Sequence, residues 1–263
     1  MKTSDNRYVI NSVLRAAKIL ESFTVEKPTL TNAELSKKLG LNKSAVTRLL
    51  QSLVKAGLIR RDENSGRYSL THKLSQIGSA YVKNTSLHIE GRPLLEQLSS
   101  KSNENAQMGM LDNTEVLYLD QVICSQHIGL MSFIGSRLPA YCTGAGKLLL
   151  AYLSEEQFKN YCRSVDFIRY TPKTIIDPTI LKNQLTEIKK AGFAVLQSEF
   201  RQDVLSIAAP VLDENGRVVA AISIAGPIFR LDHPDKVNEL IQAVVDTAKA
   251  LSVRIGYIET NPD

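Results

Sequence analysis

Basic and hydrogen-bonding side chains recur at helical spacing near the N-terminus. Together they make one short, basic, acid-free face of an expected helix, with these members: Lys43, Ser44, Thr47, Arg48 and Gln51. Hydroxyl, amide and guanidinium groups can hydrogen-bond to base edges in the major groove of DNA, and an arginine can bond a guanine edge twice. The face therefore predicts contact with double-stranded DNA, although many basic helix faces are simply solvated.

The neighbouring residues predict the helices that would position this face. Thr31 and Glu34 fit a capping box that opens a first helix, and a glycine, Gly40, ends it. Asn42 can cap the second helix. One side of the second helix is an apolar stripe, made by Val46, Leu49, Leu50 and Leu53. Two short helices joined by a tight turn predict a helix-turn-helix.

A hairpin is expected directly after the second helix. Residues 58–61 and 67–70 are short extended runs on either side of a turn that contains Gly66. The hairpin would add the wing of a winged helix-turn-helix. Its arginines are expected to neutralise phosphates or to enter the minor groove: Arg60, Arg61 and Arg67.

The charge distribution supports a phosphate-binding N-terminal domain. Residues 1–72 carry 13 Lys and Arg against 6 Asp and Glu, whereas residues 73–263 carry 19 against 21. The whole positive excess of the chain, a formal +5, therefore comes from its first 72 residues. That is the electrostatic footprint of a nucleic-acid-binding domain, whereas a helix-turn-helix shape alone could be a plain packing unit.

Length and composition limit the classes of protein to which the chain could belong. A chain of 263 residues with 43% hydrophobic residues suggests two globular domains. No apolar run approaches the roughly 20 residues that span a bilayer, and the N-terminus lacks the apolar segment of a secretory signal. Three cysteines without C-x-x-C spacing and four scattered histidines argue against a disulfide framework and a metal site. We expect a cytoplasmic protein without a cofactor.

Helices precede and follow the predicted winged domain. A first helix is expected from the spacing of Val13, Ala16, Ala17 and Leu20, with Phe23 one turn further on, and it should pack on the two helices above. A linker helix is expected from Leu74, Ile77, Gly78 and Tyr81. A further helical pattern follows Pro93, and because proline kinks helices the two segments should meet at an angle.

From residue 105 the pattern changes to strands with interspersed helices. Hairpins are expected at 106–111 with 115–122 and at 204–212 with 218–225, and further strands at 127–133 and 193–197. The run 218–225 is nearly all apolar and should be a central strand. Helices are expected at 148–153, after a capping box at Ser154, from Asp177, and from about Pro234. The second domain is therefore an α+β unit whose sheet is mainly antiparallel.

The chain resembles the IclR (isocitrate lyase regulator) family of bacterial transcription regulators over essentially its full length. The resemblance is carried by LNKSAVTRLLQSLVKAGLIRR with GRYSL, LPAYCTGAGKLLLAYL, AGFAVLQSEF and LSIAAPVLDENGRVVAAISIAGP. It implies a winged helix-turn-helix over residues 8–72, a linker helix over 73–86 and an effector-binding and oligomerisation domain with a curved, mainly antiparallel sheet over 87–260. It also implies a homodimer or homotetramer on operator DNA, modulated by a small metabolite, often a carboxylic acid.

The resemblance also places an effector pocket on three stretches of the second domain. The implied residues are Gly144, Ala145, Leu196, Val204, Ser206, Ser223 and Ala225. Part of this has a physical reason, since Gly144-Ala145-Gly146 precedes a helix and offers backbone N–H groups to an anion, while the two serines can add hydroxyl donors. The alternative is that these small residues only permit close packing of helix and strands.

Two positions differ from the family pattern and bear on the ligand, and two possible catalytic functions lack the residues that they require. Only Glu199 is acidic where many members carry several acids, and Ala225 stands where serine is frequent, so the ligand should have fewer hydroxyls or be bound differently. A phosphate-binding loop ending at Lys147 lacks the required first glycine and the Ser/Thr for magnesium. Cys142 with His127 lacks any supporting nucleophile motif. We expect no enzyme; the remaining alternative is a DNA-binding protein whose second domain serves only oligomerisation.

Overall fold

The computed structural model describes residues 9–24, 26–82, 86–124, 133–231 and 233–258. The chain divides into two compact units, Met1–Val82 and Lys83–Asp263, and the division falls within the linker expected at 73–86. Within the described ranges, no helix is both long and apolar enough to cross a membrane.

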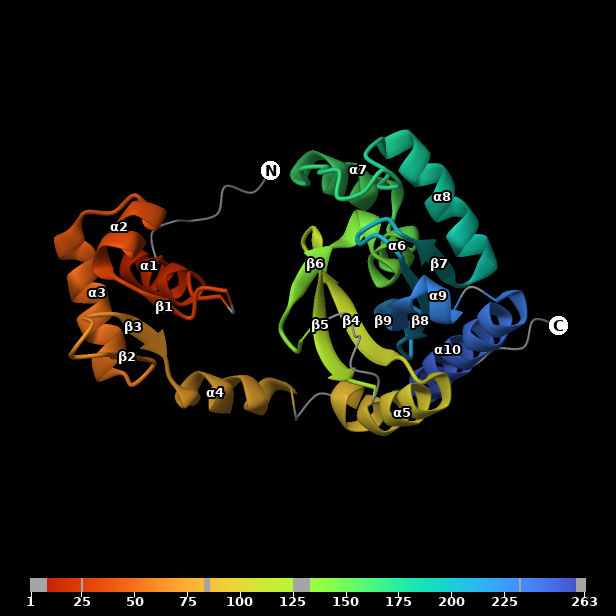
Figure 1. Ribbon diagram of the computed structural model, residues 1–263, viewed down its shortest axis with the longest axis horizontal. Coiled ribbons are helices and arrows are strands. Elements are labelled where there is room, and N and C mark those ends of the chain that lie inside the picture. Colours follow the sequence, from red (N-terminus) through yellow and green to blue (C-terminus); the bar gives the residue numbers. More distant parts are fainter. Residues whose placement is uncertain (1–8, 25, 83–85, 125–132, 232, 259–263) are drawn as a thin grey trace. The chain divides into compact units, whose positions relative to one another are not determined.

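The first unit is a winged helix-turn-helix (Figure 1). Its elements are α1 (Asn11–Leu20), α2 (Asn32–Leu39), α3 (Lys43–Lys55), α4 (His72–Val82) and an antiparallel sheet of β1 (Thr29–Leu30), β3 (Tyr68–Leu70) and β2 (Ile59–Arg61), in that order. The predicted caps of α2 and α3 and the predicted end of α2 are confirmed. Thr31 forms the capping box with Glu34, Gly40 ends α2 in the left-handed conformation at φ 63°, and the Asn42 side chain caps α3.

The core of this unit confirms the apolar stripe of α3 and corrects the face of α1. Val46 and Leu50 are fully buried. Val13 is 62% exposed, so the expected packing of that residue is wrong. The buried face of α1 is centred on Ile19, and Ala16, Leu20 and Phe23 pack there as expected, whereas Ala17 is exposed. The face is rotated toward Ile19 because isoleucine buries more apolar surface than alanine does.

The second unit is a six-stranded antiparallel sheet with helices on both faces (Figure 1). The strand order is β6-β5-β4-β9-β8-β7, with bounds β4 (Asn105–Asp112), β5 (Glu115–Val122), β6 (Arg137–Pro139), β7 (Ala194–Gln197), β8 (Val204–Leu212) and β9 (Val218–Pro227). One face carries α6 (Gly144–Ala151), α7 (Glu155–Ser164) and α8 (Pro178–Ala191). The other carries α5 (Ser86–Ser102), α9 (Ile228–Leu231) and α10 (Pro234–Arg254).

Each face of the sheet has its own apolar core. Along β9, Ile222 and Ile224 point into the core shared with α5 and α10, while Ala221 joins the core under α6 and α8. This alternation follows from the two-residue period of a strand. Because β9 is buried on both faces and lies between β4 and β8, the prediction of a central strand is confirmed.

Three expectations for this unit need correction or fall outside the description. The helix expected after Pro93 begins earlier, at Ser86, and Pro93 lies inside it. Proline has no N–H, so the carbonyl of Ile89, four residues earlier, receives no helical hydrogen bond. Ile89 is 56% exposed. The helix expected at 148–153 begins at Gly144. The strand expected at 127–133 falls almost wholly outside the described residues, and β5 pairs with β6 instead.

Candidate functional sites

The polar face of α3 remains largely open. Lys43, Ser44, Arg48 and Gln51 are exposed. Thr47 is half-buried, and its hydroxyl accepts a hydrogen bond from Asn32 Nδ2 at 2.7 Å and donates one to the carbonyl of Lys43 at 2.8 Å. The donor of Thr47 is therefore used within the fold, and the other four side chains are the ones left to contact a ligand.

The three arginines of the wing have different surroundings. Arg67 donates from Nε to Thr29 Oγ1 and from Nη2 to the Thr29 carbonyl, both at 2.9 Å, and pairs with Glu34 at 3.2 Å. It thus ties β3 to β1 and to the start of α2. Arg60 and Arg61 are exposed and make weaker contacts, one to Ser69 Oγ at 3.1 Å and one above the Tyr68 ring. Arg60 and Arg61 are the wing guanidinium groups available to phosphates.

Strand register assembles the second candidate site on the α6 face of the sheet. Leu196 of β7 lies opposite Ser206 of β8, which lies opposite Ala225 of β9. Ser223 is two residues before Ala225, so it shares that face, and it lies opposite Gln107 of β4. Residues up to 118 positions apart in the chain are thereby brought into two neighbouring cross-strand rows.

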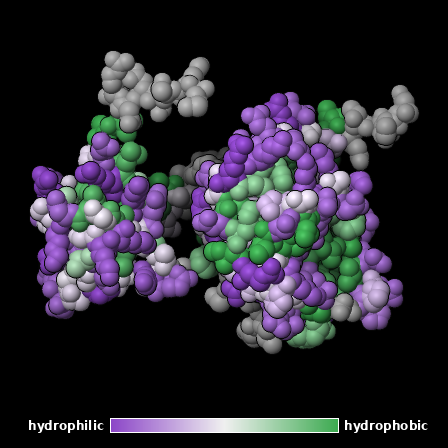
Figure 2. Space-filling model, turned by 90° about the horizontal axis from the view of Figure 1, so that it is seen from above, coloured by the Kyte–Doolittle hydropathy of each residue, from purple (hydrophilic) through white to green (hydrophobic). Residues whose placement is uncertain are grey.

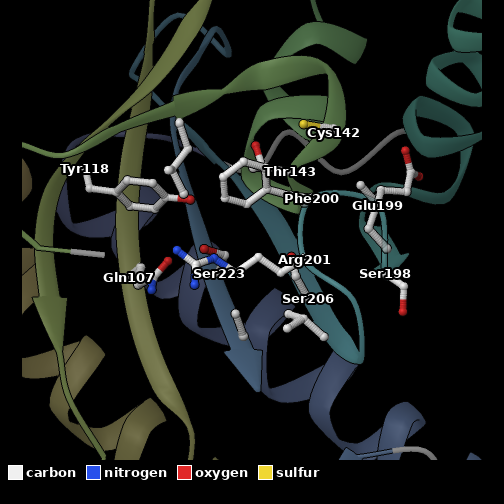
Figure 3. Close-up of a pocket in the computed structure, with 15 residues that line it drawn as sticks. Gln107, Tyr118, Cys142, Thr143, Ser198, Glu199, Phe200, Arg201, Ser206 and Ser223 are labelled. Atoms are coloured by element: carbon white, nitrogen blue, oxygen red, sulfur yellow. The ribbon is translucent and has the colours of Figure 1, made fainter. Parts of the chain in front are cut away.

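These rows form the floor of a cavity at the N-terminus of α6 (Figure 3). The cavity volume that the centres of water molecules can occupy is about 70 Å³. A single bound water needs roughly 10–15 Å³ in the same measure, so the cavity has room for a larger molecule. Among the implied effector residues, those on the wall are Gly144, Leu196, Val204, Ser206, Ser223 and Ala225. Ala145 is the exception. It is 1% exposed and packs in the core, because it follows Gly144 by about 100° around the helix.

Close packing explains part of the glycine-rich stretch as well. A Cβ on Gly146 would lie 2.3 Å from the carbonyl oxygen of Ala140, so this glycine lets α6 approach the preceding turn. A Cβ on Gly144 would lie 2.0 Å from Ser206 Oγ, at the cavity wall. The packing interpretation therefore accounts for Gly146, whereas Gly144 also keeps the cavity open.

Two largely buried residues on the cavity wall have hydroxyls that no described side chain or backbone group bonds to. The side chains of Tyr118 and Ser223 are 4% and 3% exposed, and neither hydroxyl hydrogen-bonds to another residue that the structure describes. Burial raises the pKa of Tyr118, so its phenol stays protonated and able to donate. Neither hydroxyl is among the fully enclosed polar atoms without a partner, so both face the open space of the cavity, where they can bond to water or to a polar ligand.

The loop between β7 and β8 closes one side of the cavity with Phe200 and Arg201. Figure 3 shows the Arg201 side chain extending toward Gln107 and Ser223. Its guanidinium carbon lies 5.8 Å from the centre of the Phe200 ring. No described carboxylate forms an ion pair with Arg201. The wall of the cavity therefore includes an exposed arginine whose charge no described acid balances.

A buried ion pair holds this loop beside α6. Lys147 is fully buried, and its Nζ lies 2.6 Å from Glu199 Oε1 and also donates to the side-chain oxygen of Gln184. Burial lowers the pKa of Lys147, and Glu199 opposes that shift. The hydroxyls of Thr171 and Thr174 donate to the Ser198 and Glu199 carbonyls, both at 2.6 Å. The loop carrying Arg201 is thus fixed from two sides.

The geometry offers no support for the catalytic alternatives. Burial, then the charge of Glu199, raises the pKa of Cys142 to about 12, so its thiol is protonated and unreactive at neutral pH. His127 lies outside the described residues. Lys147 is occupied by Glu199 and cannot reach a phosphate. Among the residues the structure describes, no cluster of His, Cys, Asp and Glu could hold a metal ion.

Sequence reasoning missed much of the cavity wall, notably Gln107, Tyr118, Thr143, Phe200 and Arg201. The first two carry a signal in hindsight, since a polar and an aromatic residue stand in otherwise apolar strand positions. The last two lie on a loop, where no periodicity indicates which way a side chain points.

Known proteins resemble both units. The IclR helix-turn-helix domain matches residues 12–63, and the IclR C-terminal domain of bacterial transcriptional regulators matches residues 79–253. Over 249 residues the chain is 31% identical to the transcriptional repressor IclR of Escherichia coli strain K12, which covers 94% of this chain and 90% of that protein.

Solved structures share the fold over more than nine-tenths of the chain. A transcriptional regulator from Rhodococcus sp. RHA1 superimposes with a TM-score of 0.82 at 28% identity, covering 94% of this chain and 98% of that one. An IclR homolog from Microbacterium hydrocarbonoxydans, crystallised with 4-hydroxybenzoate, superimposes with a TM-score of 0.80 at 23% identity, covering 93% and 98%. The second likeness, at that identity, shows the fold alone.

Proposed function

This chain belongs to the IclR family of DNA-binding transcriptional regulators, and from that premise we propose that a small carboxylic acid controls its binding to operator DNA. The acid would bind in the cavity of the second unit, and the protein would act as a homodimer or homotetramer at a catabolic operon. The observation that carries this proposal is the cavity, on whose wall the Tyr118 and Ser223 hydroxyls and the Arg201 guanidinium have no hydrogen-bonding partner among the described residues.

The DNA part of the proposal assigns different tasks to helix and wing. Arg48 and Gln51, exposed on α3, would read base edges, with Lys43 and Ser44 at the helix start. Arg60 and Arg61 would contact phosphates from the wing. Thr47 and Arg67 would act mainly within the domain, since their polar groups already bond to Asn32 and to Thr29.

Exposed apolar surface on the first unit supports assembly. Four apolar side chains near the start of α1 are between 43% and 65% exposed: Val9, Ile10, Val13 and Leu14. Figure 2 shows hydrophobic residues gathered next to the grey N-terminal atoms. Ile77 of the linker helix is 55% exposed as well. One recognition helix reads too few base pairs for a unique genomic site, so pairing through such surfaces would supply the second half-site.

The ligand part rests on chemistry that a packing domain would not need. Among the described residues, no side chain hydrogen-bonds to the Tyr118 and Ser223 hydroxyls or to the exposed Arg201 guanidinium, so all three are free to bond to a ligand in the cavity. The relative crystallised with 4-hydroxybenzoate has the same fold, which makes an acid of similar size a reasonable first probe. Modulation requires that the ligand prefer one arrangement of the DNA-binding units over another.

The experiment uses the full-length protein. Genomic fragments that it retains are sequenced and footprinted to define the operator, and its affinity is then measured by fluorescence anisotropy against a panel of keto, hydroxy and aromatic acids. We expect a pseudo-palindromic site and, for at least one acid, a change of about 5- to 150-fold in affinity. A protected operator whose affinity no acid alters, with no acid bound in calorimetry, would favour the oligomerisation-only alternative.

A further inference from the structure

We propose that Arg201 sets the charge of the ligand, so that the cavity takes a monocarboxylic acid with an apolar, ring-sized body. The inference rests on the proposed effector function and makes it specific. It assigns the anion to a side chain of the β7–β8 loop, with the N-terminus of α6 as a secondary donor.

The formal charges of the residues on the cavity wall favour a ligand with one negative charge. Of the described residues on its wall, only Glu199 and Arg201 carry a formal charge. Glu199 is neutralised by the fully buried Lys147. Arg201 is left as a net charge of +1, which one carboxylate would balance. A second carboxylate would enter without a partner, and an uncompensated buried charge is strongly unfavourable.

The loop geometry fixes where that positive charge lies. Ser198 and Asp203 both adopt φ of +58°, and the Ser198 N–H donates to the Val204 carbonyl at 2.7 Å, which closes the loop tightly. Phe200 packs edge-on against Tyr170, with ring centroids 4.9 Å apart. Because its neighbours are held in this way, Arg201 is presented at the cavity with little freedom of its backbone to be lost on binding.

The surroundings of Arg201 fit a carboxylate at one end of the cavity. Its guanidinium extends toward Gln107 and Ser223 (Figure 3), and the Ser223 hydroxyl has no partner among the described residues. A carboxylate between them could accept two hydrogen bonds from the arginine and one from the serine. A full guanidinium charge attracts an anion more strongly than the roughly half charge of a helix N-terminus.

The rest of the wall fits an apolar body. Leu138, Leu196, Val204 and Ala225 supply aliphatic surface, and Phe200 supplies an aromatic face. Tyr118 adds a ring and a protonated hydroxyl that can donate to one further oxygen. Polar groups therefore fix the orientation of a ligand whose remaining contacts are apolar, which is the usual make-up of a small-molecule site.

The test compares pairs of ligands of similar size that carry different charges. Isothermal titration calorimetry on the full-length protein would use benzoate against benzamide, and butyrate against succinate. Arg201→Gln removes the charge, Arg201→Lys keeps it without the planar fork, and Arg163→Gln changes an exposed arginine on α7 as the control. Thermal melting would verify that each variant folds as the wild type does.

We expect the wild type and Arg163→Gln to prefer benzoate to benzamide and butyrate to succinate. Arg201→Gln should bind benzoate at least about tenfold more weakly than the wild type and should no longer prefer benzoate to benzamide. The benzoate affinity of Arg201→Lys should lie between those of the wild type and Arg201→Gln. Equal benzoate affinity in Arg201→Gln would overturn the role of Arg201. Tighter binding of succinate would overturn the monoanion assignment while leaving the effector function standing, whereas failure of every acid to bind would overturn both.

Discussion

Removal of one partner from the buried Lys147–Glu199 pair should destabilise the second unit far more than removal of an exposed pair. Lys147 is fully buried, and the Glu199 side chain is only 8% exposed. Lys147→Met keeps the length of the side chain but leaves Glu199 with the Gln184 amide at 3.4 Å as its nearest side-chain donor. An uncompensated charge in such a site costs about 3–5 kcal/mol of folding free energy.

That cost corresponds to a large shift in melting temperature. For a domain of 150–250 residues each kcal/mol changes Tm by about 2–4 °C, so Lys147→Met should lower the Tm of the second unit by about 6–20 °C. Replacement of both partners, Lys147→Met with Glu199→Leu, should recover most of this loss, because a buried pair exchanged for apolar residues is often neutral or stabilising. The non-additivity of the double-mutant cycle is therefore the quantity that the structure predicts.

The matched control is the exposed pair between Lys182 and Glu155. Its two charged atoms lie 2.6 Å apart, yet the side chains are 48% and 57% exposed. Lys182→Met should cost less than about 1 kcal/mol. The assay is urea unfolding followed by circular dichroism at fixed protein concentration, since assembly makes stability concentration-dependent. If Lys147→Met and Lys182→Met proved equally mild, the assignment of Lys147–Glu199 as a buried ion pair would be refuted.

The same pair gives a pH dependence of known sign. Burial already lowers the pKa of Lys147 in the folded protein, and Glu199→Gln removes the charge that opposes this shift. Folded Lys147 would then bind fewer protons than unfolded Lys147 up to the ordinary lysine pKa of about 10.4. The stability of Glu199→Gln should therefore rise as pH increases toward that value. A flat profile relative to wild type would contradict this reasoning.

Further substitutions test the other assignments. Arg48→Ala should reduce discrimination among operator sequences by about 1–3 kcal/mol, whereas Arg61→Ala should weaken all DNA similarly and flatten the salt dependence; anisotropy at several salt concentrations distinguishes the two. Arg67→Ala should lower the stability of the first unit in thermal unfolding, because it removes the bonds to Thr29, and loss of DNA affinity without loss of stability would reassign it as a phosphate contact. Cys142 should be the last cysteine alkylated at pH 8, as mapped by mass spectrometry, since its pKa is raised to about 12. Above about pH 9 the thiol of Cys142 ionises in the unfolded protein but not in the folded one, because burial raises its pKa only in the folded protein. The free energy of unfolding should therefore fall as pH rises above about 9.

Local signals in the sequence predicted the first unit well. The capping box at Thr31, the left-handed Gly40 and the Asn42 cap are each decided within a few residues, and all three are confirmed. The face of α1 was mispredicted because Ala16 fits two overlapping apolar patterns, and only packing against α2 and α3 selects the one with Ile19. The fold of this unit is thus encoded locally, and its packing is settled by tertiary contacts.

The second unit shows where family resemblance and periodicity stop being informative. Resemblance brought Leu196, Ser206, Ser223 and Ala225 to attention, and strand register places them in adjoining rows. It also implied Ala145, whose side chain is turned into the core by one residue of helix rotation, while its backbone lies in the first turn of α6. A residue can therefore lie beside the cavity in the chain while its side chain faces away from it.

Arg201 could not be predicted because its position depends on contacts distant in sequence. The loop that carries it is held by Thr171 and Thr174, more than 20 residues earlier, and by Lys147 through Glu199, 52 residues apart. None of these contacts leaves a local pattern. Since strand positions shape the cavity and loop positions supply its charge, relatives can share the cavity and still prefer ligands of different charge. If Arg201 binds the ligand as proposed, the number of uncompensated charges on the wall would be a better guide to the ligand than overall identity.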